Sequence, residues 1–156
     1  MRIILAFILM LFAAPAFAQD WSHYDNGRFG YGIDIPPGFD GRGESDNGDG
    51  QGFDYPGKSI SLLVWGGNLL DGFETEIAAR KGYAEDDAWH LTYESQSARW
   101  ASFSGIKGFR ILYQRMILLC DDTSYASFQL EYSVADAAMD PIINRLVSSL
   151  KVPDCK

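Results

Sequence analysis

Three stretches in the second half of the chain have the hydrophobic pattern of β-strands. They cover residues 97–103, 109–119 and 124–134, and two turn segments, residues 105–108 and 121–123, separate them. In the third stretch every second residue is apolar, and the residues between are polar. The apolar set is Ala126, Phe128, Leu130, Tyr132 and Val134. This alternation predicts an antiparallel meander with one face against a core and the other face in solvent.

Two amphipathic helical segments are expected to cover the apolar face of this sheet. The first runs from a capping-box-like start, Asp71 with Glu74, to about residue 84. The second is capped by Asp140, has Pro141 in its first turn and carries an apolar stripe to about residue 150. Further strands are predicted at residues 29–35, 58–65 and 90–95. The sequence therefore predicts an α+β fold, a central antiparallel sheet covered by two helices.

The N-terminal residues 1–18 have the pattern of a secretory signal peptide. Arg2 precedes a short apolar run, and small residues stand at Ala16 and Ala18, as signal peptidase requires. The apolar run is shorter than the roughly 20 residues of a membrane span. We expect residues 19–156 to form one domain, periplasmic or secreted, with no membrane span after cleavage.

The charge balance excludes one large class of partners. The chain has 13 basic and 21 acidic residues, a net charge of −8. Such a balance argues against nucleic acid as a partner and is typical of a soluble exported protein with an acidic surface.

Cys120 and Cys155 are the two cysteines of the chain, and export would carry them into an oxidising compartment. We therefore expect a disulfide between them, with two free thiols as the alternative. Closing this loop would stabilise the fold by about 3–4 kcal/mol on the chain-entropy estimate.

Residues 40–54 are rich in glycine and acidic side chains, and we expect an exposed loop there. Asp46, Asp49 and Asp54 are the candidate ligands for a hard cation such as calcium. The spacing does not fit an EF-hand, because Pro56 stands where the bidentate glutamate belongs. A plain flexible acidic loop is the favoured interpretation, so no metal and no cofactor are predicted.

No catalytic motif is recognisable. The sequence has no nucleophile elbow and no phosphate-binding loop, and its histidines, His23 and His90, are far apart. Aromatic residues are the other signal. Trp65 and Trp100 are expected to pack under helices, whereas Tyr55 and Trp89 are candidates for an exposed binding groove. Together with Asp46 and Asp49, these two are the candidate interaction residues.

Several segments resemble a family of small secreted bacterial proteins of unknown function with a PsbP-like fold. They are residues 24–37, Val64-Trp65-Gly66, residues 104–113 and residues 140–143. The superfamily of that fold includes an extrinsic subunit of plant photosystem II and a nuclear transport factor that binds a small GTPase. Both are noncatalytic accessory proteins built on a central antiparallel sheet between helices. The resemblance implies the fold but no functional residue.

These observations predict a noncatalytic accessory or interaction module that binds an exported or envelope partner. The alternatives are a hydrolase-like enzyme with a dispersed site and a protein that binds a small ligand or calcium.

Overall fold

The computed structural model describes residues 20–136 and 138–152. The expected signal peptide, residues 1–18, and Cys155 lie outside the described residues, so cleavage and the disulfide stay predictions. The elements in chain order are β1 (Ser22–Asp25), β2 (Gly32–Ile35), β3 (Asp40–Glu44), β4 (Gly50–Asp54), β5 (Ser61–Asn68), α1 (Phe73–Asp86), β6 (His90–Gln96), β7 (Trp100–Lys107), β8 (Arg110–Leu118), β9 (Ser124–Ser133) and α2 (Met139–Ser149).

Seven of the described strands form one antiparallel sheet in the order β3-β4-β5-β9-β8-β7-β6. The predicted meander is confirmed as β7, β8 and β9, which are neighbours in the sheet. The strand expected at residues 58–65 is β5, and it lies between β4 and β9 as a central strand. The α+β fold with a central antiparallel sheet and two helices is therefore confirmed.

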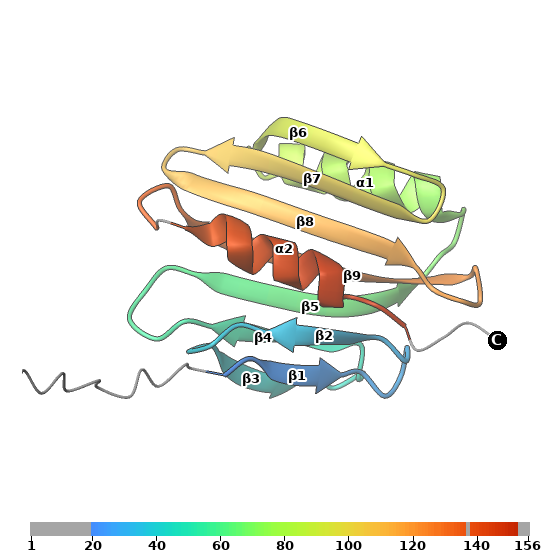
Figure 1. Ribbon diagram of the computed structural model, residues 1–156. Coiled ribbons are helices and arrows are strands. Elements are labelled where there is room, and N and C mark those ends of the chain that lie inside the picture. Colours follow the sequence, from blue (N-terminus) through green and yellow to red (C-terminus); the bar gives the residue numbers. More distant parts are fainter. Residues whose placement is uncertain (1–19, 137, 153–156) are drawn as a thin grey trace, which may run out of the picture.

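The two helices lie on opposite faces of this sheet (Figure 1). On one face, which we call the α2 face, α2 lies over β5 and β9, and the separate β1–β2 hairpin lies over the β3–β4 edge of the sheet. The core there is apolar and includes the fully buried side chains of Ile33, Leu62, Phe128, Leu130 and Leu146. The other face, the α1 face, carries α1 over β6 and β7.

The polar face of β9 is not the solvent face that the alternation predicted. Ser127 is fully buried, and Gln129 and Glu131 are half-buried. The physical reason is that these side chains bond to neighbouring polar groups on the sheet: Gln114 of β8 donates to Ser127, and both Arg110 and Gln129 donate to Glu131. Val134 lies beyond the end of β9 and is exposed.

The acidic segment of residues 40–54 is not a plain loop, which corrects the expectation. It forms the β3–β4 hairpin at the edge of the sheet, with Asp40 opposite Asp54. Every residue of β3 is exposed, so this edge strand needs no apolar side chains. Its sequence therefore lacks the apolar alternation that would predict a strand. Gly50 is buried against the backbone of β5, where a Cβ atom would lie 2.0 Å from the Val64 carbonyl oxygen.

The predicted capping box at Asp71 is wrong. The N-cap of α1 is Gly72, whose φ of 90° lies in a region that favours glycine, and no side chain caps the helix. The second helix begins at Met139, so Asp140 lies inside its first turn instead of capping it. Among the described residues, neither helix is long and apolar enough to cross a membrane.

Candidate functional site

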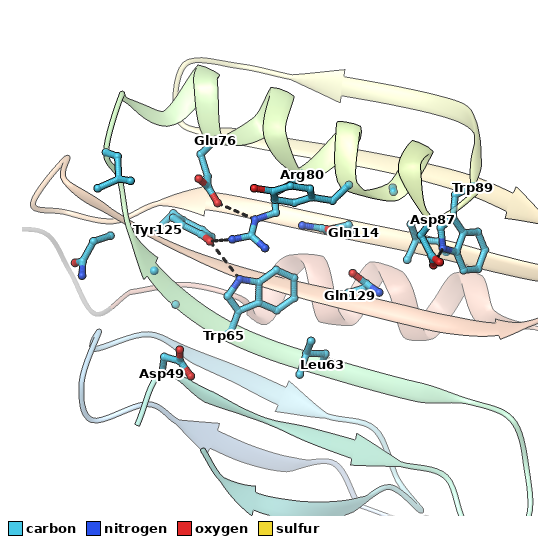
Figure 2. Close-up of a pocket in the computed structure, with 17 residues that line it drawn as sticks. Asp49, Leu63, Trp65, Glu76, Arg80, Asp87, Trp89, Gln114, Tyr125 and Gln129 are labelled. Carbon is cyan, nitrogen blue, oxygen red and sulfur yellow. Dashed lines mark hydrogen bonds and ion pairs between the residues drawn. The ribbon is translucent and has the colours of Figure 1, made fainter. Parts of the chain in front are cut away.

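A groove of about 630 Å³ opens on the α1 face, between α1 and the strands that this helix leaves uncovered (Figure 2). Its residues come from β5, β8, β9, α1, the two turns that flank the helix and the β3–β4 turn. The groove exists because α1 packs over β6 and β7, so that β5 and β9 are open on this side of the sheet. These two strands and the neighbouring strand β8 supply its floor.

A glycine in β5 shapes one end of the groove. A Cβ atom at Gly67 would lie 2.7 Å from the ring of Tyr125 on the neighbouring strand β9. Without that atom the Tyr125 ring lies close over β5, and its hydroxyl oxygen accepts a hydrogen bond from Nε1 of Trp65 at 3.3 Å. Gly67 therefore allows two aromatic side chains to meet at this end of the groove.

Arg80 of α1 joins this aromatic pair. Its Nε donates to the Glu76 carboxylate at 2.7 Å, and its Nη2 donates to the Tyr125 hydroxyl (Figure 2). The guanidinium carbon also lies 5.5 Å from the ring centroid of Trp65 and 5.7 Å from that of Tyr83. These contacts fix the orientation of Arg80, because a planar guanidinium both stacks on rings and donates in defined directions.

The Tyr125 hydroxyl stays protonated over a wide pH range. Burial raises the pKa of Tyr125, and the nearby Glu76 carboxylate raises it further, while Trp65 and Arg80 act in the opposite direction. Removing the hydroxyl proton inside the protein would place a second negative charge beside Glu76. The hydroxyl therefore serves as a neutral hydrogen-bonding group.

A second polar cluster stands at the opposite end of the groove. Nε1 of Trp89 donates to the Asp87 carboxylate at 3.1 Å, and Lys107 forms an ion pair with the same carboxylate at 3.0 Å. The Lys107 ammonium holds the pKa of Asp87 below its usual range. Lys107 also lies 5.7 Å from the centroid of the Trp89 ring. Both ends of the groove thus combine a tryptophan, a carboxylate and a cation.

Two amide side chains from adjacent strands form the middle of the floor. Gln114 of β8 and Gln129 of β9 stand directly opposite each other in the sheet register. Their Nε2 atoms donate to Ser127 at 3.2 Å and to Glu131 at 2.9 Å, respectively. Leu63 of β5 adds an exposed apolar side chain beside them. The floor offers fixed polar groups next to apolar surface, which is the composition of a binding site.

The structure separates the interaction residues suggested by the sequence. Trp89 lines the groove, although its own side chain is buried. Tyr55 lies elsewhere, in a smaller cavity beside the start of α2, where it packs edge-to-face against Phe39. Of the two tryptophans expected under helices, Trp65 lines the groove half-buried, and Trp100 is half-buried under Arg115.

The three candidate cation ligands do not converge. Asp54 forms an ion pair with Arg42, and Asp49, at the rim of the groove, accepts hydrogen bonds from Ser45 at 2.7 Å and Asn47 at 2.9 Å. Asp46 is exposed in the β3–β4 turn. Among the described residues, no group of three or more His, Cys, Asp or Glu side chains could hold a metal ion.

The residues that organise the groove carry little signal in the sequence. Glu76 and Arg80 are four residues apart, the spacing of an ion pair along one helix face, and this spacing could have been noticed. Tyr125 and the two floor amides gave no such signal. They come together only because the meander sets their strands side by side and α1 lies across them.

No protein-family model and no curated protein matches this sequence. Solved structures do match its fold. The solution structure of cyanobacterial PsbP (CyanoP) from Synechocystis sp. PCC 6803 aligns with a TM-score of 0.65 and 13% identity, over 92% of this chain and 99% of that one. The Ran-binding protein Mog1p of Saccharomyces cerevisiae aligns with a TM-score of 0.62 and 10% identity, over 88% and 97%.

A mutant of Mog1 gives the same TM-score and identity as Mog1p, over 86% of this chain and 97% of that one. Identities this low establish a shared fold and nothing about shared residues. The chain has the PsbP-like fold, in agreement with the resemblance seen in its sequence.

Proposed function

We propose that this protein is an exported, noncatalytic interaction module that binds a partner from the envelope or the secreted fraction in the groove of the α1 face. The observation that carries this proposal is the groove itself. Its polar side chains are held in place by one another, so a partner would meet a largely pre-formed surface. Such a surface serves recognition, because little side-chain freedom is lost on binding.

The structural neighbours support a role in binding. Mog1p is named as a Ran-binding protein, so this fold has at least one member that recognises another protein. The groove is lined by Trp65, Arg80 and Tyr83, and tryptophan, arginine and tyrosine are the residue types that contribute most often to the centres of protein interfaces.

Site-directed photocrosslinking in living cells tests the proposal. A benzoyl-phenylalanine is placed at Leu63 or Tyr83, which line the groove and are 44% and 62% exposed. The matched control is Phe109, which is 82% exposed in the β7–β8 turn and does not line the groove. We expect one crosslinked species of defined mass from both groove positions and none from Phe109. No crosslink from the groove, or the same crosslinks from all three positions, would contradict the proposal.

Export is a separate part of the proposal and has its own test. We expect N-terminal sequencing of the protein recovered from the periplasm or the medium to begin at Gln19. The same material should carry the disulfide between Cys120 and Cys155, seen as a mass two hydrogens lower than that of the reduced chain. An uncleaved chain in the cytoplasm would contradict export without affecting the groove.

A further inference from the structure

A second exposed surface lies on the opposite side of the sheet from the groove. On the α2 face, α2 covers β5 and β9 and the β1–β2 hairpin covers β3 and β4, whereas β6 and β7 lie clear of both (Figure 1). Tyr93 of β6 and Ile106 of β7 are 50% and 42% exposed on this part of the sheet. We call this region of β6, β7 and β8 on the α2 face the Arg115 surface, after the residue at its centre.

Arg115 of β8 is held in a fixed orientation on this surface. Its guanidinium carbon lies 4.2 Å from the ring centroid of Trp100, and its Nη1 donates to the Ser102 hydroxyl at 3.1 Å. Ser102 stands directly opposite Arg115 on β7. The stacking on Trp100 and the hydrogen bond to Ser102 restrict the orientation of the Arg115 guanidinium. The guanidinium is therefore preorganised to bind a planar anion such as a carboxylate.

This arginine lacks the carboxylate that most arginines of the protein have. Among the described residues, five arginines form an ion pair with an acidic side chain: Arg42, Arg80, Arg99, Arg110 and Arg145. Arg115 forms none, and its Nε is buried without any hydrogen-bond partner. A buried donor without a partner costs stability, so the arrangement is unfavourable for the isolated chain.

The carboxylates of the neighbouring strands are engaged elsewhere. Glu94 of β6 points to the opposite face and pairs with Lys81 of α1, and Glu131 of β9 pairs with Arg110. Burial lowers the pKa of Arg115, opposed only by the phenols of Tyr113 and Tyr93. The guanidinium remains charged at neutral pH, because its ordinary pKa lies above 12.

We propose that the Arg115 surface docks an acidic segment of another protein, whose Asp or Glu carboxylate forms the ion pair that Arg115 lacks within this chain. The partner's carboxylate would meet the terminal nitrogens of the fork, while Trp100, Tyr93 and Ile106 supply apolar contact around it. The choice of an acidic partner rests on charge complementarity at this point of the surface. The proposal is independent of the groove, which lies on the other face.

Selection from random peptides displayed on phage tests this proposal without assuming a sequence. The protein carries a net charge of −8, so long-range electrostatics alone would favour basic peptides. We expect enrichment of peptides with an Asp or Glu beside apolar residues. Their affinity, measured by fluorescence polarisation, should fall at least about tenfold in Arg115→Gln.

Arg28→Gln is the matched control, because it removes the same charge from an exposed arginine that forms no ion pair with any described residue. It should change the affinity less than about twofold. No enriched peptide, enrichment without acidic residues, or equal losses in the two variants would overturn the proposal.

Because Arg115→Gln could weaken binding by misfolding, NMR of the unmodified protein provides a second test. The Nε–Hε resonance of Arg115 should shift when a selected peptide is added, and should stay in place with the peptide whose acidic residue is replaced by its amide. Inorganic phosphate at the same concentration should leave the resonance in place. An unmoved resonance with the acidic peptide, or an equal shift with phosphate, would overturn the acidic-segment proposal.

Discussion

The two faces of the seven-stranded sheet are built on different chemistry. On the α2 face the strands present a continuous apolar layer to the helix, with Phe128 and Leu130 fully buried beneath α2. On the α1 face the apolar contacts divide into two smaller clusters, and polar Gln114 and Ser127 are buried between the strands. The part of the α2 face beneath α2 resembles the interior of a stable domain, whereas the part of the α1 face beside α1 resembles a binding site.

The difference assigns separate tasks to the two faces. Removal of apolar surface from water is the dominant stabilising contribution to folding, and the α2 face supplies most of it. On the α1 face, buried polar groups form hydrogen bonds with one another. Ser127 accepts a hydrogen bond from Gln114 and donates one to the Arg115 carbonyl oxygen at 2.8 Å. Satisfied networks of this kind fix side-chain orientation while adding little net stability.

The largest expected effect comes from truncating the apolar layer. Phe128→Ala removes a fully buried ring from the α2 face and should lower the free energy of unfolding by about 3–5 kcal/mol. Leu63→Ala, in the groove on the α1 face, should change it by less than about 0.5 kcal/mol, because Leu63 is already exposed. Chemical denaturation of both variants measures the contrast. Equal losses would refute the division of tasks between the faces.

The second effect concerns the edge of the sheet, where close backbone approach replaces apolar packing. Gly50→Ala would place a methyl group against the Val64 carbonyl oxygen, so β4 must move away from β5, and we expect a loss of about 3 kcal/mol. Gly52→Ala is the control on the same strand, since its methyl would meet only the flexible Arg42 side chain. Thermal unfolding compares the two. A Gly52 variant as unstable as the Gly50 variant would contradict the backbone explanation.

This edge also shows why the sequence predicted one part of the fold and missed another. The meander was predictable because Ala126, Phe128, Leu130 and Tyr132 alternate with polar residues under a helix. The β3–β4 hairpin was not, because an exposed edge strand needs no apolar alternation and glycine at position 50 is required by packing that only the folded sheet reveals.

The groove was predictable only in fragments. The sequence suggested Trp89 for an exposed groove; the residue borders the groove, but its side chain is buried, so its part in binding stays a prediction. No sequence pattern connected Trp89 with Arg80 or Tyr125, which are brought together by a helix lying across strands that are distant in sequence. A sequence pattern predicts the local helix or strand, whereas a site built from β5, β8, β9 and α1 depends on how these elements are arranged in space.

A smaller effect is expected from the hydroxyl that joins Arg80 to Trp65. Tyr125→Phe keeps the ring but removes the acceptor for both donors, and should lower the free energy of unfolding by about 1 kcal/mol. The loss stays modest because Arg80 keeps its bond to Glu76. The emission of Trp65 should change more than that of Trp100, which single-tryptophan variants can resolve. A loss as large as that of Phe128→Ala would place this cluster among the principal stabilising contacts.

The smallest expected effect tests a polar contact at the rim of the α2 face. The Asp34 carboxylate of β2 accepts hydrogen bonds from His23 at 2.8 Å and from Arg145 of α2 at 3.0 Å. The His23 hydrogen bond, with a further contribution from Arg145, holds the pKa of Asp34 below its usual range. Folding therefore favours the charged carboxylate, and its contribution is complete above the unfolded pKa of about 3.9 and is lost as the pH falls through the lower folded value.

Asp34→Asn should consequently lower the free energy of unfolding by about 0.5 kcal/mol at pH 6 and by less at pH 3, because both partners are about half exposed and the pairs are screened. Urea unfolding at the two pH values measures the difference. Asp46→Asn, which alters an exposed carboxylate in the β3–β4 turn, should leave the stability unchanged at both pH values. A loss for Asp34→Asn that grew toward pH 3 would contradict a lowered folded pKa. The attachment of α2 to β2 would then depend on apolar contacts and on the hydrogen bond from the Asp34 backbone N–H to the Ser149 hydroxyl.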